Sequence, residues 1–398
     1  MHLAKEFPSV PAFALFELGF RPFFVAAGMF SALAIGVWMF DYAFAVHWIH
    51  ADVSGVQWHA HEMIFGYSMA VIAGFLLTAV GNWTGVSGLR GKPLATLLVV
   101  WLVARMTYFL PSSVALVVSA MADAVFTAGL ILAVGRPVVQ VKQWNQLWIL
   151  ALLLALLISN LLFHAGLQGY LTEGVRWGLY LGLYLIMALI FAMTRRVLPF
   201  FIERGVSETF QPRTRRWIDI GSMVLFFVWI AMDVFVQQEE WVTLLSAALF
   251  VLHAVRMYDW FTPGMLRAPL LWSLFVGYGF LLIGFLLKGL SVWFDISPTL
   301  ALHAFSFGGI GLITLSMMSR VSLGHTGRKV HDPPKSVVFM FTMILLGTLA
   351  RVIIPIVDVS HYAIWIVVSQ ALWLLAFGSF LTTFVPILSK PRVDGRRG

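Results

Sequence analysis

Long apolar runs, separated by short polar or charged stretches, fill almost the whole chain. A bilayer core is about 30 Å thick and a helix rises about 1.5 Å per residue, so about 20 apolar residues cross it. Twelve runs have this length: 22–46, 58–80, 93–110, 113–135, 146–167, 177–200, 217–236, 241–260, 270–290, 297–319, 336–356 and 361–388. The pattern predicts an all-α polytopic membrane protein, with one transmembrane domain over residues 1–398.

The basic residues are distributed unevenly between the two sides that these helices define. With the N-terminus inside, 22 of the 26 lysines and arginines lie in inner segments or their flanks. Because cytoplasmic loops carry the excess of Lys and Arg, we expect both termini in the cytoplasm. Residues 1–21 carry charges and lack a signal-peptide pattern, so we expect no cleaved leader.

Composition excludes several classes of protein. Only 11% of the 398 residues are charged and 60% are hydrophobic, whereas soluble domains carry about 25% charged residues. The net charge of +8 then indicates basic cytoplasmic loops and no nucleic-acid partner. The chain has no cysteine, which excludes disulfides, iron–sulfur clusters, thiolate zinc sites and covalently attached haem.

The predicted topology sorts the eleven histidines by depth. Four lie within about 10 Å of the outer boundary: His59, His61, His164 and His303. Ionisable residues inside a membrane are costly and usually functional, and imidazole binds copper, haem iron and zinc. We therefore predict an outer metal layer, although interfacial histidines with polar partners would produce the same pattern. Positions two apart differ by about 200° on a helix, so His59 and His61 either serve two centres or flank a helix start.

Two further histidines lie deeper. His253 is near mid-membrane, and His325 lies in a stretch, 319–328, that reads as too polar to continue the tenth helix. We interpret both as additional ligands. Arg320 and Arg328 on the inner side, and Arg105 and Arg176 on the outer side, are candidate partners for haem propionates. Basic inner loops are the simpler explanation for the first two.

Several polar residues near the outer histidines are candidates for supporting roles. Glu62 would orient a histidine or carry protons, and Asn160 shares a helix face with His164. Tyr67 and Ser306 are further candidates for proton delivery, with Asp123 as a distant member. We assign Glu62 and Tyr67 as the candidate catalytic residues. His2, His47, His50, His331 and His361 lie in termini, loops or helix edges and are expected to be solvated.

The same stretches resemble the NnrS family of bacterial inner-membrane proteins. The resemblance covers most of the chain and is carried by Phe20-Arg21-Pro22-Phe23-Phe24, Trp58-His59-Ala60-His61-Glu62, Gly74-Phe75-Leu76-Leu77-Thr78, Asn160-Leu161-Leu162-Phe163-His164, Arg195-Arg196-Val197-Leu198-Pro199, His303-Ala304-Phe305 and Gly324-His325-Thr326-Gly327-Arg328. Gly81 is a minor departure from the family pattern.

The resemblance implies haem b and copper in a multi-pass protein of the bacterial inner membrane that protects against nitric oxide. Three functions remain open at this point. One is binding and reduction of nitric oxide at a haem–copper site, with electrons from a quinol or a periplasmic donor. The second is a non-catalytic sensor or scavenger of nitric oxide, and the third is a secondary transporter, since twelve helices with both termini inside is a common transporter layout.

Overall fold

The computed structural model describes residues 13–50, 52–206 and 210–396. Within them, twelve helical spans are long and apolar enough to cross a membrane, as the sequence predicts. The spans comprise α1 (Phe20–Phe44), α2 (Gly55–His61) to η1 (Glu62–Ser68) to α3 (Met69–Thr84), α4 (Gly91–Met106) with η2 (Thr107–Phe109), α5 (Ser113–Gln140), η3 (Trp144–Gln146) with α6 (Leu147–Leu167), α7 (Gly174–Gly205), α8 (Arg216–Ala231) with η4 (Met232–Val236), α9 (Glu239–Trp260), α10 (Pro269–Phe294) after η5 (Pro263–Arg267), α11 (Pro298–His303) to η6 (Ala304–Gly311) to α12 (Leu312–His325), α13 (Lys335–Thr348) to η7 (Leu349–Ile353) to α14 (Ile354–Val357), and α15 (Tyr362–Ser389). The chain is a multi-pass membrane protein.

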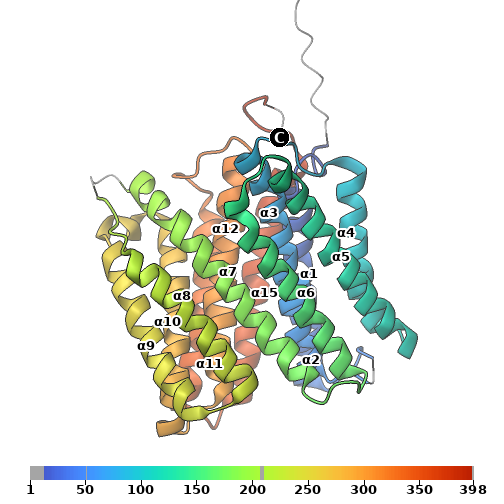
Figure 1. The fold of residues 1–398 in the computed structure, drawn as a ribbon, viewed down its shortest axis with the longest axis vertical. Coiled ribbons are helices and arrows are strands. Elements are labelled where there is room, and N and C mark those ends of the chain that lie inside the picture. The colour runs from blue at the N-terminus through green and yellow to red at the C-terminus, as the bar shows by residue number, and fades with distance from the viewer. Residues whose placement is uncertain (1–12, 51, 207–209, 397–398) are drawn as a thin grey trace, which may run out of the picture.

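The two ends of the described chain lie at the same end of the bundle. The first span, α1, packs along the last, α15. The Ala14 amide donates to the Ser389 carbonyl at 2.9 Å, and the buried Arg21 guanidinium donates to the carbonyls of Leu388 and Lys390 at 2.8 Å each. Figure 1 shows that α2 and α11 lie at the opposite end from the C-terminus. This arrangement agrees with an even number of spans.

Four of the spans contain π-helical turns: η1, η4, η6 and η7. Each lies near a span end in the half of the bundle that is remote from the termini, and η1 and η6 begin directly after His61 and His303. An extra residue in a helical turn rotates everything beyond it, and such turns are frequent at functional sites. The wide turns thus coincide with the layer where the outer histidines were expected.

The tenth span is longer than predicted. We expected residues 319–328 to be too polar to continue that helix, and this was wrong, because α12 runs to His325. Its polar groups are covered by protein: the buried Ser319 hydroxyl donates to the Leu315 carbonyl at 2.8 Å, and the Arg320 guanidinium lies 3.8 Å from the centre of the Phe201 ring. A polar helix inside a bundle avoids the lipid that makes such a segment costly.

Reporter fusions test the orientation that the basic residues predict. Fusions after residue 50 should report a periplasmic position, and fusions near residues 90, 210 and 330 and at the C-terminus a cytoplasmic one. A cytoplasmic signal after residue 50 would place the α2 end of the molecule inside the cell and reverse the predicted sidedness of the sites below.

Candidate metal centre

The four outer histidines lie in the expected half of the molecule but form two separate groups. His61 and His164 are buried together, while His59 and His303 line a different cavity. His59 and His61 are two residues apart on one continuous helix that begins at Gly55, so their side chains leave it in different directions. We predicted one layer of four histidines, and the structure divides these histidines between two neighbouring sites.

The first site joins His61, Asp123 and His164, which come from α2, α5 and α6. The Nε2 atoms of His61 and His164 lie 3.8 and 3.9 Å from Asp123 Oδ2, and the three ligand atoms are all within 4.8 Å of one another. Metal bonds of about 2.0–2.2 Å, the values for zinc, would place two such donors roughly 3.5 Å apart. All three side chains are buried, so the group has the spacing and enclosure of a metal site.

The imidazoles of this site present free nitrogen lone pairs. The His61 Nδ1 lies 2.8 Å from Glu62 Oε1, and with the ring proton on Nδ1 and donated to Glu62, the Nε2 lone pair faces Asp123. The Asn160 side-chain amide lies 3.1 Å from the same Nε2. Both ring nitrogens of His164 are buried without a hydrogen-bond partner. A carboxylate on the far ring nitrogen is the usual partner of a metal-bound histidine. The prediction that Glu62 orients a histidine agrees with this contact, whereas Asn160 reaches His61 instead of supporting His164.

A buried charge network surrounds the three ligands. The Arg105 guanidinium donates to both oxygens of Asp123, and its Nε lies 3.2 Å from Glu62 Oε2. Ionised, the two carboxylates and the single guanidinium leave one excess negative charge in a region closed to water. Burying an uncompensated charge costs several kcal/mol, roughly, so the network favours a bound cation or a protonated histidine. Arg105 therefore pairs with these two carboxylates.

The second site is a cavity of about 60 Å³ between spans α2–η1, α7 and α11–η6. His59 and His303 line it from two sides, together with Met63, Tyr67 and Ser306. The His303 Nδ1 donates to the Thr299 carbonyl at 2.7 Å, which leaves Nε2 unprotonated, and the buried His59 Nδ1 has no hydrogen-bond partner. Histidine is a common ligand of haem iron, so the two available imidazoles make this largely apolar cavity a candidate haem site.

The two candidate catalytic residues lie at different sites. Tyr67 lines the second cavity, where its hydroxyl donates to Thr314 Oγ1 at 2.7 Å. Glu62 points the other way, into the network of His61 and Arg105. One of the two candidate proton-carrying residues thus lies beside each site, although they are close in sequence.

His253 lies on α9 and is buried inside the bundle. Its ring stacks on Phe191 at 4.4 Å, with Nδ1 against the Tyr278 hydroxyl and Arg256 alongside. Its Nε2 is buried without a partner. The structure does not bring this histidine to either outer site, so its role as a ligand stays a prediction.

The candidate propionate partners are widely separated. Arg176 donates to the carbonyls of Asp233 and Val234 at the end of span α8–η4. Toward the termini, His325 packs against Phe20 at 5.6 Å, and Arg328 has a buried Nη1 without a partner. Burial also lowers the pKa of the Arg328 guanidinium. Arg328 and His325 lie toward the termini, away from both outer cavities. The proposed contacts of Arg176, Arg320 and Arg328 with haem propionates remain predictions, whereas Arg105 pairs with Glu62 and Asp123.

We did not predict Asp123 as a candidate ligand, because we considered it only as a distant member of a proton path. One signal was available: Asp123 is the single acidic residue of the apolar span α5. An acid at mid-span must be paired within the bundle or bind a cation. Tyr108, whose hydroxyl lies 3.4 Å from His61 Nδ1, was also missed, and nothing in its local sequence distinguishes it.

A comparison with protein-family models agrees with the resemblance seen in the sequence. The model described as NnrS protein matches residues 14–392, nearly the whole chain. The comparison with curated proteins gives no match. The matched region includes every span and both groups of outer histidines, and the chain belongs to the NnrS family.

Proposed function

We propose that this protein binds and reduces nitric oxide in the bacterial inner membrane, using copper and haem b held by the outer histidines. Family membership fits a membrane protein of the nitric oxide response. The observation that carries the proposal is the buried group of His61, Asp123 and His164, whose charge network has one negative charge too many. A copper ion supplies the missing positive charge and prefers the imidazole ligands offered there.

Haem b is assigned in this proposal to the cavity between His59 and His303. Both imidazoles have a nitrogen available to iron, and the remaining walls are mostly apolar or aromatic. Either one of the two imidazoles would hold the haem iron, which when bound would supply a position for the diatomic ligand and exchange electrons. Tyr67 lines the cavity together with Ser306, and its phenol is the proposed proton donor.

The reaction fixes what the protein must deliver. Two nitric oxide molecules, two electrons and two protons give one nitrous oxide and one water. A quinol or a periplasmic redox protein is the electron donor in this proposal. Glu62 and Tyr67, one beside each site, are the proposed proton-carrying groups.

Single substitutions should separate the two metals. His61→Ala and His164→Ala should lower bound copper and leave the haem absorption band, because they remove copper ligands only. His59→Ala and His303→Ala should instead weaken or reshape the haem spectrum. His361→Ala, at an exposed loop position, is the control; His2, a second control suggested by the sequence, lies outside the described residues. Full copper, full haem and an unaltered spectrum in all four variants would refute the assignment.

Anaerobic amperometry of the purified protein tests whether the function is catalytic. With a reduced donor, the wild-type protein should consume nitric oxide continuously, and the His61→Ala variant should not. Loss of a single equivalent per protein would indicate a scavenger or sensor. A colourless protein free of metal would favour a transporter.

A further inference from the structure

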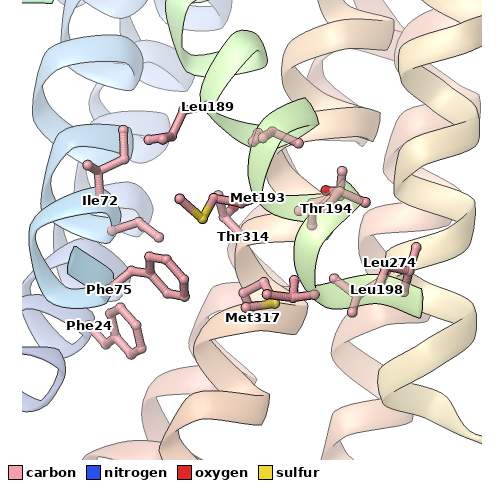
Figure 2. A pocket seen from close by; sticks show the side chains of 14 residues that line it. Phe24, Ile72, Phe75, Leu189, Met193, Thr194, Leu198, Leu274, Thr314 and Met317 are labelled. Atoms are coloured by element: carbon pink, nitrogen blue, oxygen red, sulfur yellow. The ribbon is translucent and has the colours of Figure 1, made fainter. Parts of the chain in front are cut away.

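A second cavity, lined almost entirely by apolar side chains, continues from the histidine cavity toward the other end of the bundle. It has a volume of about 80 Å³ and lies between α1, α3, α7, α10 and α12. Figure 2 shows side chains from opposite sides facing the space, with Ile72 and Phe75 of α3 across from Met193 and Leu198 of α7. We call it the apolar chamber, and the space between His59 and His303 the histidine cavity.

The two spaces follow one another along the same three spans. On the second span, Met63 and Tyr67 line the histidine cavity, and Val71 and Phe75 the apolar chamber. These four positions are separated by the i, i+4 interval that keeps side chains on one helix face. The other two spans border both spaces at the i, i+7 interval, which also keeps side chains on one face, with Leu183 then Ile190 on α7, and Ile310 then Met317 on η6–α12. One continuous face of each helix therefore borders both spaces.

One hydrogen-bonded pair stands between them. Tyr67 lines the histidine cavity, Thr314 lines the apolar chamber, and their hydroxyls are 2.7 Å apart. Thr314 also donates to the Ile310 carbonyl at 2.6 Å. The Tyr67 ring is buried, and it packs edge-on against Trp373 and Phe377. The pair therefore lies at the border between the two linings.

The lining of the chamber defines the ligand class. It has no charged side chain, and its two hydroxyl groups come from Thr194 and Thr314. A ligand that needs several hydrogen bonds, such as a quinone or an anionic headgroup, would leave its polar atoms unpaired there at a cost of about 1–3 kcal/mol each. A small uncharged diatomic molecule has no such requirement.

We propose that the apolar chamber holds small uncharged gas molecules and passes them to the histidine cavity at Tyr67. That the gas is nitric oxide rests on the proposed function. The apolar chamber would then supply the ligand to the imidazoles of the histidine cavity, and the hydrogen-bonded pair of Tyr67 and Thr314 would lie on the ligand's path.

Xenon tests the chamber without relying on any metal or on activity. Purified protein in nanodiscs should show a saturable xenon signal by 129Xe magnetic resonance. Leu189→Trp and the milder Val71→Phe, which fill the chamber, should reduce this signal. Leu154→Trp, at a half-exposed position on the outer surface of α6, should leave it unchanged. An equal xenon signal in filled and control variants, or co-purification of a quinone or lipid in the chamber, would overturn the proposal.

Stopped-flow mixing with nitric oxide then tests the passage. Leu189→Trp should slow ligand binding about tenfold, equivalent to about 1.4 kcal/mol on the barrier, with metal content unchanged. Tyr67→Phe should speed binding, because it removes the hydrogen bond to Thr314; a purely proton-donating tyrosine would leave the binding rate unchanged. Xenon uptake combined with unaltered binding rates in both variants would refute the passage. If the protein does not react with nitric oxide, the proposed function fails and the xenon result alone decides the chamber.

Discussion

Asp123→Asn should purify with almost no copper while keeping its haem. The substitution preserves shape but removes the anionic oxygen that lies 3.8 and 3.9 Å from the two imidazole nitrogens. It also cancels the excess negative charge that favours a cation in this buried site. Losing even an indirect partner of a metal ligand weakens binding about 10–100-fold, so losing a charged ligand should cost at least that much. Elemental analysis of protein washed with a weak chelator measures the loss.

Asp358→Asn is the matched control for this result. Asp358 lies in the connection between α14 and α15, where it pairs with His361 and Trp365 outside both sites. Its substitution should leave copper unchanged. Copper retained by the Asp123 variant at the wild-type level would show that Asp123 is not a ligand and that the buried charge is balanced by a proton.

Arg105→Gln should destabilise the folded protein by about 3–5 kcal/mol, the usual cost of removing one partner from a buried ion pair. Arg105 is buried and lies between Glu62 and Asp123. Without it, two carboxylates face each other across a region closed to water. A thermal unfolding scan in detergent should show a large fall in the midpoint, and the fall should be smaller when copper is bound.

A rescue variant distinguishes charge balance from lost packing. Adding Glu62→Gln to Arg105→Gln removes one of the two unpaired charges and should recover part of the stability. Arg136→Gln, at an exposed position on α5, should have little effect. A rescue variant no more stable than Arg105→Gln alone would mean that the network is held by packing and not by charge.

The transmembrane spans were predictable because their signal is local. Each crossing needs a long apolar run, and the chain shows twelve, including the division at Pro111 between two closely spaced spans. The predicted end of the tenth span was wrong because protein, and not lipid, surrounds the polar residues there. The end of α12 contains Ser319, Arg320 and Ser322, and its helix persists because neighbouring spans cover it. Residue type alone does not reveal which face meets lipid.

The sequence predicts how deep the four histidines lie in the bundle, but it does not predict which of them lie together. Counting residues along each span correctly placed His61, His164, His59 and His303 in one half of the bundle. How they pair depends on the rotation of each helix about its axis, and the π-helical turn η1 alters that rotation within the span. Asn160 illustrates the consequence: it shares a helix with His164, yet its amide oxygen contacts His61.

X-ray absorption at the copper edge of the purified protein tests whether His61, Asp123 and His164 hold a copper ion. We expect stoichiometric copper with a first shell of nitrogen and oxygen only, and with the outer scattering of imidazole rings. That scattering should fall in the His164→Ala variant and persist in His361→Ala. Sulfur among the atoms bound to copper would place the ion at a methionine, such as Met63 of the second cavity. A protein without copper would mean that a proton balances the charge of the buried group. Either result would contradict the assignment of copper to His61, Asp123 and His164.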